Sequence, residues 1–314
     1  MNSRVTVILP VYNGMPYLQD AVKSVLGQTF AEFTFMIIDD GSTDASAEFL
    51  QTLRDPRILV IHQANVGQGA ARKMALRRCQ TEYVAFMDQD DISLPDRFAK
   101  QVEYLDAHSR IVIVGTQIEF LIGSSTQRAL SAPTTHEEID ACLLRGRAGI
   151  CCPSLMFRST PAKEIDDYPS GMLGEDIAFC LCMSERGRIG NLEGVHLQYR
   201  LHSAQTSLAK SGQLIRSNRY AAYCGLCRRS GLQPKTFERF LNNASLFSRL
   251  HWNVEAWELI QYRTGRIHIA NGRWVRGFIR LALLGVCRPF KAIQRIAQTV
   301  RTSFKQSLRV GQRA

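Results

Sequence analysis

Short runs of β-branched and aromatic residues alternate with amphipathic helical runs through the first hundred residues of this chain. Strands are expected at 5–9, 33–38, 58–62, 83–87 and 111–120. Helices are expected at 16–26, 45–53 and 68–79, after Pro95, and from Asp176 to Gly187. This alternation is typical of βαβ units, which put parallel strands in one sheet with helices on its faces. The sequence therefore predicts an α/β fold with a Rossmann-like, mostly parallel sheet.

Acidic residues follow two of these strands directly. The second strand ends in Asp39 and Asp40, and the fourth is followed by Asp88, Asp90 and Asp91. Ligands of doubly wound sheets bind beyond the carboxyl ends of the strands, so both acidic groups are expected at the binding edge. Carboxylates this close repel one another unless a cation lies between them, and carboxylate-bound Mg²⁺ or Mn²⁺ commonly holds a diphosphate. The pattern favours a nucleotide substrate, and turn or helix capping by the same aspartates is the structural alternative.

A dinucleotide-binding loop is a competing interpretation. Gly67-Gln68-Gly69 follows a strand and begins a helix, as the phosphate-binding loop of such a site does. However, Arg72 occupies the third glycine position, and the first strand runs into Pro10 and Tyr12 without a glycine turn. Hydride transfer with a nicotinamide cofactor is therefore disfavoured.

Several short motifs together resemble the family 2 inverting glycosyltransferases, which have the GT-A fold. They are 8–14 (ILPVYNG), 25–30 (VLGQTF), 38–44 (IDDGSTD), 65–67 (NVG) with 71–72 (AR), 87–91 (MDQDD), 174–176 (GED) and 199–207 (YRLHSAQTS). Their order and spacing match the family over about residues 4–207. The resemblance implies an enzyme that moves a sugar, hexosyltransferase-like, from a nucleotide-sugar that is commonly UDP-linked. It also implies a saccharide or lipid-linked saccharide acceptor in cell-surface polysaccharide or glycolipid synthesis.

The resemblance further implies which residues bind the donor and a metal ion. The positions that match nucleotide contacts are Pro10, Tyr12, Asp39, Asp40, Arg72 and Asp88. In the D-x-D motif, Asp88 matches a residue near the ribose and Asp90 matches a ligand of Mg²⁺ or Mn²⁺. Asp91 and His202 are further candidates for the metal.

The E-D motif implies the catalytic group. Asp176 matches the base that takes the proton of the acceptor hydroxyl, and Glu175 beside it is the second catalytic candidate. We expect Asp176 in the first turn of a helix, where the N-terminal field favours the ionised carboxylate and makes it a weaker base. Charge complementarity at the helix N-terminus is the structural alternative for both residues.

The charges of the chain divide sharply near residue 204. Residues 1–204 hold 19 Lys and Arg against 25 Asp and Glu, whereas residues 205–314 hold 20 against 3. Such an asymmetry is typical of a tail that faces a polyanion or an anionic membrane. We therefore expect a catalytic domain over 1–207 and a basic helical C-terminal extension over 208–314.

One segment of the extension has a basic amphipathic pattern. On a helical wheel Arg273, Arg276, Arg280 and Arg288 share one side, Lys291 and Arg295 continue it, and the other side holds Trp274, Phe278, Leu281, Ala282 and Val286. This pattern is typical of a helix on an anionic membrane surface, expected through residues 273–295. The alternative to membrane binding is that this segment forms a pair of helices that pack on the catalytic domain and leave their basic face in solvent. Because no apolar run is long enough to span a bilayer, we expect a cytoplasmic protein that is peripheral on the membrane.

Two other functions fit parts of the pattern. A non-catalytic nucleotide-sugar-binding protein would share the fold, and the basic tail could by charge alone bind nucleic acid. The paired aromatic platform of a single-strand binder is not evident in the tail, so nucleic acid is not an expected partner. The 9 cysteines are an odd number without a regular framework and are expected as reduced thiols, without zinc.

Overall fold

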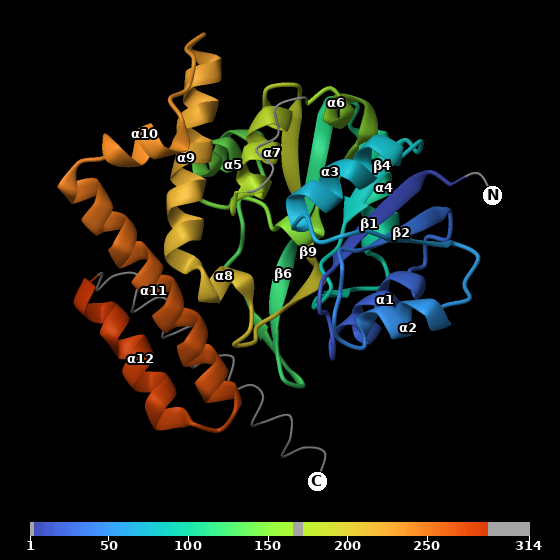
Figure 1. The fold of residues 1–314 in the computed structure, drawn as a ribbon, viewed down its shortest axis with the longest axis horizontal. Helices are drawn as coiled ribbons and strands as arrows, with labels where there is room; N and C mark the ends of the chain where they lie inside the picture. Colours follow the sequence, from blue (N-terminus) through green and yellow to red (C-terminus); the bar gives the residue numbers. More distant parts are fainter. Residues whose placement is uncertain (1–2, 166–171, 288–314) are drawn as a thin grey trace. The chain divides into compact units, whose positions relative to one another are not determined.

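The computed structural model describes residues 3–165 and 172–287 of the chain (Figure 1). The chain forms two compact units. The first comprises Met1–Ile118, Ser131–Tyr199 and Asn218–Pro234, and the second comprises Glu119–Leu130, Arg200–Ser217 and Lys235–Ala314. The units interleave along the sequence, and the division of the chain at residue 207 stays a prediction.

The first unit carries a parallel sheet that begins at the N-terminus. β1 (Val5–Val11) pairs in parallel with both β2 (Phe33–Asp39) and β4 (Tyr83–Phe86), and β2 pairs in parallel with β3 (Ile58–His62). The intervening helices are α1 (Leu18–Leu26), α2 (Ser46–Thr52) and α3 (Gln68–Arg78). Every residue of β1 is buried, as expected for a central strand covered on both faces. The predicted α/β architecture is confirmed, and the carboxyl ends of β1, β2 and β4 point the same way.

Antiparallel strands extend this sheet beyond β4. The full order is β3-β2-β1-β4-β8-β6-β9-β5, with β7 on β6. The added strands are β5 (Ile92–Ser93), β6 (Ile111–Ile122), β7 (Ser125–Arg128), β8 (Met156–Arg158) and β9 (Arg188–Arg200). No strand was predicted over the segment of β9, because its polar residues and glycines show no clear alternation. It is a strand because it pairs in the sheet with segments that are distant in sequence, β5 and β6.

Helices cover the two faces of the sheet with separate hydrophobic clusters. Alternate residues of β1 divide between them, with Ile8 in one cluster and Val7 and Leu9 in the other. The remaining helices of this unit include α4 (Arg97–Ala107), α5 (His136–Leu143), the 3₁₀ turn η1 (Cys152–Ser154), α6 (Ser159–Lys163) and α7 (Glu175–Ser184). Phe157 contacts the rings of Phe86 and Phe179, each at 4.9 Å between centroids. This packing fixes α7 against the strand that leads into Asp88.

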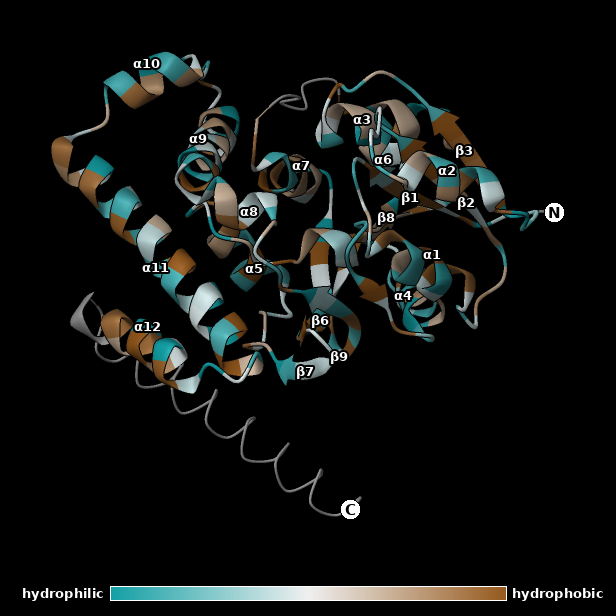
Figure 2. Ribbon diagram, turned by 60° about the horizontal axis from the view of Figure 1, so that its bottom comes forward, coloured by the Kyte–Doolittle hydropathy of each residue, from teal (hydrophilic) through white to brown (hydrophobic). Residues whose placement is uncertain are grey.

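The second unit is mainly helical, which confirms the predicted helical character of the C-terminal region. Its helices are α8 (Thr206–Ala209), α10 (Phe237–Asn242), α11 (Leu246–Ala270) and α12 (Trp274–Cys287), and α9 (Ser211–Arg229) has residues in both units. Figure 2 shows much of α12 in the brown of hydrophobic residues. Arg288, Lys291 and Arg295 of the predicted basic face lie outside the described residues. Among the residues that the structure describes, no helix has the length and hydropathy needed to cross a membrane.

Candidate active site

Asp39 and Asp40, at the end of β2, are both buried and both hydrogen-bonded by the protein. Asp39 accepts a hydrogen bond from the backbone N–H of Ser42 (3.0 Å) and lies 2.9 Å from Nδ1 of His62. Burial opposes ionisation of Asp39, but the hydrogen bonds from Ser42 and His62 outweigh it and lower the pKa of this carboxyl. Asp40 accepts from the Gln63 amide (2.6 Å) and from the N–H groups of Val66 (3.0 Å) and Gly67 (2.8 Å). Asp40 thus ties the end of β2 to the loop that starts α3.

Pro10 and Tyr12 lie at the end of β1, beside this pair. Pro10 is buried opposite Ile38 in the parallel register. The Tyr12 side chain is 47% exposed, so its ring is available for stacking. The backbone of Tyr12 is held by Gln89, whose Oε1 accepts from the Tyr12 N–H (2.8 Å) and whose Nε2 donates to the Tyr12 carbonyl (3.1 Å). Gln89 was not expected as a site residue, and its place inside the D-x-D motif was the one signal for it in the sequence.

Asp88, Asp90 and Asp91 gather after β4. Carboxylate oxygens of the three lie within 4.8 Å of one another, and Asp91 is fully buried. Burial raises the pKa of Asp88 to about 6, helped by the negative charges of Asp90 and Asp176 and opposed by Arg72. Closely spaced carboxylate oxygens are the donors that Mg²⁺ and Mn²⁺ prefer, so this cluster fits the predicted metal.

Arg72 of α3 is a buried cation that contacts Asp88 and Glu175. It is 3% exposed, forms an ion pair with Asp88 and lies 3.6 Å from Glu175, measured from Nη1 to Oε1. Its guanidinium also stands over the Phe86 ring, 4.9 Å from the centroid. The residue expected to contact the nucleotide therefore lies between Asp88 and Glu175, and its contact with the nucleotide stays a prediction.

Glu175 and Asp176 occupy the first turn of α7, as predicted. Burial raises the pKa of Glu175 to about 7, and burial also raises the pKa of Asp176, although the Ile177 N–H donates to its carboxylate (2.9 Å). The expectation that the helix N-terminus makes Asp176 a weaker base was wrong, because desolvation by burial exceeds the opposing effect of the backbone hydrogen bond at the helix end. Asp176 acts on the pKa of Asp88, so the E-D motif lies near the D-x-D motif.

Gly69 makes room for Glu175. A Cβ atom at this position would lie 1.4 Å from Glu175 Oε2, so any larger residue would displace the carboxylate. The Gly67-Gln68-Gly69 run, which looked like part of a dinucleotide-binding loop, instead lets α3 approach the E-D motif. No sequence-based argument reveals this contact, because the two residues are joined only by the fold.

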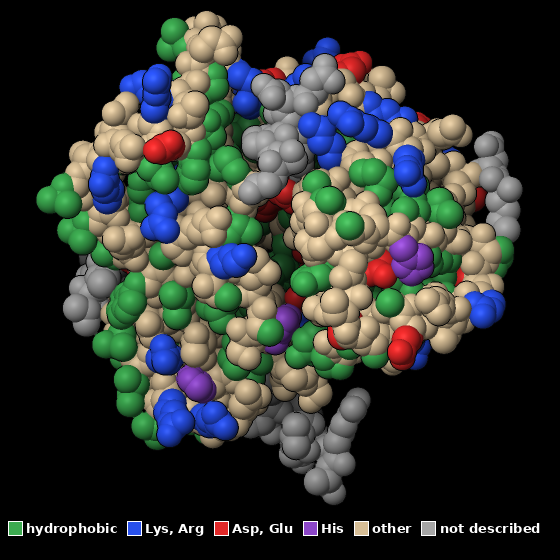
Figure 3. All heavy atoms as spheres, in the orientation of Figure 1, with side chains coloured by type: hydrophobic (Ala, Val, Ile, Leu, Met, Phe, Trp, Pro, Cys, Tyr) green, Lys and Arg blue, Asp and Glu red, His purple; other side chains and the backbone are tan. Residues whose placement is uncertain are grey.

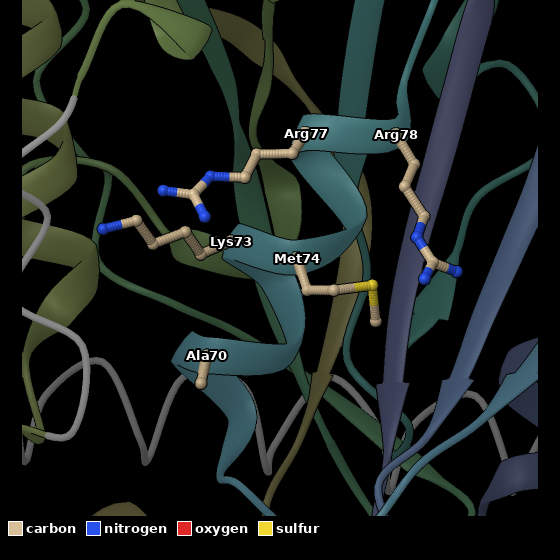
Figure 4. A pocket seen from close by; sticks show the side chains of 5 residues that line it. All are labelled: Ala70, Lys73, Met74, Arg77 and Arg78. Carbon is tan, nitrogen blue, oxygen red and sulfur yellow. The ribbon is translucent and has the colours of Figure 1, made fainter.

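His202 belongs to the second unit, and its role as a metal ligand stays a prediction. A cavity of about 310 Å³ lies along α3 and is lined by Ala70, Lys73, Met74, Arg77 and Arg78 (Figure 4). Figure 4 shows Lys73 and Arg77 pointing to one side and Arg78 to the other. Because these basic side chains do not converge on one point, they do not form a defined anion site.

Known proteins resemble this chain over the segment that carries most of these site residues. The model of the family described as "Glycosyl transferase family 2" matches residues 6–166, about half of the chain. The chain belongs to glycosyl transferase family 2. This glycosyltransferase is 33% identical to TuaG of Bacillus subtilis, named for teichuronic acid biosynthesis, over 58% of this chain and 73% of that protein. An uncharacterized glycosyltransferase of Nostoc sp. is 29% identical over 66% of this chain and 67% of its own length. The match to a relative from Rickettsia conorii, at 37% identity, spans only 32% of that longer protein.

Solved structures confirm the predicted GT-A fold of the glycosyltransferase. Residues 1–349 of S. aureus TarS, in complex with UDP-GlcNAc, align with a TM-score of 0.57 and 18% identity over 91% of this chain and 92% of that one. The mannosyltransferase PcManGT from Pyrobaculum calidifontis, in complex with GDP-Man and Mn²⁺, aligns with a TM-score of 0.57 and 16% identity over 97% and 87%. At these identities the likeness shows the fold alone.

Proposed function

We propose that this glycosyltransferase moves a hexose from a nucleotide-sugar, namely a UDP-sugar, to a hydroxyl of a saccharide acceptor with inversion at the anomeric carbon. One observation carries the proposal: Asp88 of the D-x-D motif and Glu175 of the E-D motif both lie against the buried side chain of Arg72. The negative charge of these carboxylates favours binding of a divalent cation at the D-x-D motif. It also favours proton uptake by a carboxylate of the E-D motif.

The donor would be held by residues from both strand ends. Tyr12 would stack on the nucleobase, with Pro10, Asp39 and Asp40 shaping its pocket, and Asp88 would lie near the ribose. Asp90 and Asp91 would hold Mg²⁺ or Mn²⁺, and His202 is a further candidate ligand. The bound ion would neutralise negative charge on the leaving diphosphate. The fold shared with proteins that bind UDP-GlcNAc, or GDP-Man and Mn²⁺, supports this assignment.

Asp176 would act as the general base. The acceptor oxygen forms a bond to the anomeric carbon while the bond from that carbon to the diphosphate oxygen breaks, and the nucleoside diphosphate leaves with the electron pair. The proton of the acceptor hydroxyl passes to the Asp176 carboxylate. Its raised pKa makes it a stronger base than an exposed aspartate. Glu175, the second catalytic candidate, would keep Arg72 in place beside Asp176.

The acceptor class is proposed from the chain's charge and its relatives. A saccharide or lipid-linked saccharide of cell-surface polysaccharide or glycolipid synthesis suits a relative named for teichuronic acid biosynthesis. A lipid-linked acceptor would be met at the anionic cytoplasmic face of a membrane, where the strongly basic residues 205–314 would favour peripheral association.

The test compares Asp176→Asn with the wild type on a panel of UDP-sugars in the presence of Mn²⁺. We expect turnover, followed as UDP release, to fall by about 10³-fold while UDP affinity stays within about twofold. Asp20→Asn, which alters an exposed first-turn carboxylate of α1, is the matched control and should turn over normally. Equal slow turnover by Asp176→Asn and the wild type would contradict the base assignment and favour a non-catalytic binding protein.

A further inference from the structure

The outer face of α12 is apolar and exposed. This helix packs on α11 through a narrow seam in which Gly277, Leu281 and Leu284 are buried. A Cβ atom at Gly277 would lie 2.8 Å from the Gly265 carbonyl oxygen, so the two helices meet almost backbone to backbone. Leu281, expected on the outward apolar side, instead lies in the seam. The close approach leaves most of the circumference of α12 uncovered by α11.

The uncovered side holds a continuous stripe of large apolar residues. Their exposed fractions are 47% for Trp274, 73% for Val275, 39% for Phe278, 56% for Ile279 and 40% for Leu283. At ~100° per residue these positions span an arc of about 180° along the helix. The rings of Trp274 and Phe278 stack with centroids 6.3 Å apart, which makes one flat apolar surface. Figure 3 shows hydrophobic side chains gathered in the region of α11 and α12.

Arginines border this stripe. On the helical wheel Arg273, Arg276 and Arg280 fall between the exposed stripe and the buried seam. Arg273 and Arg276 are exposed, whereas Arg280 donates to the Gln261 side chain (2.8 Å). Residues 205–314 hold only 3 acidic residues against 20 basic ones, so charge complementarity calls for an anionic partner. A symmetric contact between two copies of this face would bring the same arginines together.

We propose that α12 lies in the interface of an anionic lipid bilayer. The stripe from Trp274 to Leu283 would enter the boundary between headgroups and acyl chains, and Arg273 and Arg276 would meet lipid phosphates. The apolar residues would insert into the membrane, and the arginines would make binding selective for anionic lipid. The stripe shares no residue with the proposed donor site, so vesicle binding can be measured without a transferase assay.

Sedimentation of the full chain with vesicles tests the proposal, using phosphatidylglycerol mixed with phosphatidylcholine against phosphatidylcholine alone. We expect binding only to the anionic vesicles, a loss of at least about tenfold for Val275→Ser with Ile279→Ser, and about fivefold for Arg276→Gln. Leu246→Ser with Phe247→Ser is the matched control, because these residues are 84% and 79% exposed on α11, away from the stripe, and it should bind like the wild type.

Three results would overturn the lipid assignment. The first is a wild type that ignores anionic vesicles at low salt, and the second is a stripe variant that binds as well as the wild type. The third is a lipid-free dimer, seen by sedimentation velocity, that the stripe variant abolishes, since the partner would then be a second copy. Circular dichroism of each variant confirms that the helical content is intact.

A second inference concerns Gln89 and rests on the proposed function. The two hydrogen bonds between the Gln89 amide and the Tyr12 backbone join the metal-side loop to the base-side end of β1. The amide is closely packed, because a Cβ atom at Gly14 would lie 2.8 Å from Gln89 Oε1. The residue flanked by Asp88 and Asp90 therefore also holds the backbone that carries the Tyr12 ring.

We infer that Gln89 is a positioning residue that couples the metal and the nucleobase. Binding of an ion at Asp90 would restrain the loop, and Gln89 would pass that restraint to Tyr12, so Mn²⁺ and UDP would strengthen each other's binding. A residue with only a packing role would change stability without changing this mutual effect.

Calorimetry of UDP with and without Mn²⁺ tests the coupling. We expect Gln89→Leu to reduce the Mn²⁺-induced gain in UDP affinity by at least about fivefold, with UDP affinity in the absence of metal changed less. Gly14→Ala, which displaces the amide without touching the aspartates, should show the same loss. An unchanged gain in both variants overturns the inference, whereas a wild type that binds no UDP overturns the proposed function itself.

Discussion

The two acidic groups at the strand ends differ in how the protein satisfies them. The base-side pair, Asp39 and Asp40, receives hydrogen bonds from backbone N–H groups and neighbouring side chains, and the pKa of Asp39 is lowered. In the metal-side group, which comprises Asp88, Asp90, Asp91, Glu175 and Asp176, the buried Arg72 forms ion pairs with Asp88 and Glu175. Burial raises the pKa of Asp88, Glu175 and Asp176. The ends of β2 and β4, on either side of β1, therefore carry the same residue type in different environments. The lowered pKa of Asp39 favours its charged form, whereas the raised pKa of Asp88, Glu175 and Asp176 disfavours theirs.

The largest expected effect is on turnover when the metal-side group loses a ligand. Asp90→Asn should lower turnover of a UDP-sugar by at least about 10³-fold and abolish the effect of Mn²⁺ on UDP affinity, because the ion supplies the charge that stabilises the leaving diphosphate. Release of UDP at saturating donor measures turnover, and calorimetry of UDP with and without Mn²⁺ measures the effect of the ion on affinity. Asp39→Asn should weaken UDP binding while leaving its Mn²⁺ dependence in place. Should both variants show the same Mn²⁺ response, the contrast between the groups would fail.

Removal of the shared cation should come next. Arg72→Met leaves buried carboxylates without their arginine, and we expect the free energy of unfolding to fall by about 4 kcal/mol without metal. Millimolar Mn²⁺ should recover more stability in Arg72→Met than in the wild type, because the ion replaces the missing positive charge. Urea unfolding with and without Mn²⁺ provides both values. A loss of stability that Mn²⁺ does not reduce would show that Arg72 contributes only packing over Phe86.

The base-side pair should respond to hydrogen bonding but not to metal. In Asp40→Asn the new amide faces the Gly67 N–H, a donor against a donor, and we expect a loss of about 3 kcal/mol in unfolding free energy. Mn²⁺ should leave this loss unchanged. The same urea experiment checks it, and Asp20→Asn on the exposed face of α1 is the control. If Mn²⁺ restored the stability of Asp40→Asn, the base-side pair would respond to the metal as the metal-side group does, and the contrast between the two groups would fail.

The smallest expected effect is the pH dependence of stability due to Glu175. Its pKa of about 7 exceeds the ordinary value of 4.5, so the folded state holds this proton more tightly than the unfolded state. The resulting stability is complete below pH 4.5 and is lost as pH rises through about 7. Glu175→Gln removes this loss, so its stability relative to the wild type should rise by about 2 kcal/mol between pH 5 and pH 7. Unfolding free energies are measured for both proteins at several pH values in that range. A difference between them that does not change with pH would contradict a raised pKa of Glu175.

Much of the site followed from motif positions, but the contacts inside it did not. Asp88 and Asp90 were expected at one edge of the sheet, and the structure brings their carboxylates together with Asp176 near Asp88. Gln89 carried no signal beyond its place between two aspartates, since its partner is the backbone of Tyr12, 77 residues away. Gly69 resembled a phosphate loop in sequence and instead accommodates Glu175. The outward face of α12 was predicted as apolar, but the wheel alone placed Leu281 on it rather than in the seam.

Local pattern was enough to predict the alternating strands and helices of the first hundred residues, the resemblance to the family, and the acidic residues at the carboxyl ends of β2 and β4. Side-chain periodicity and strand direction depend only on near neighbours in the chain, which is why these features can be read from residue order. The protonation of those acids was decided by the folded molecule. Burial by α7 and the position of Arg72 bring atoms from distant segments around the carboxylates, and desolvation depends on that surrounding volume. For Asp176 this reversed the direction that its place at a helix N-terminus had suggested.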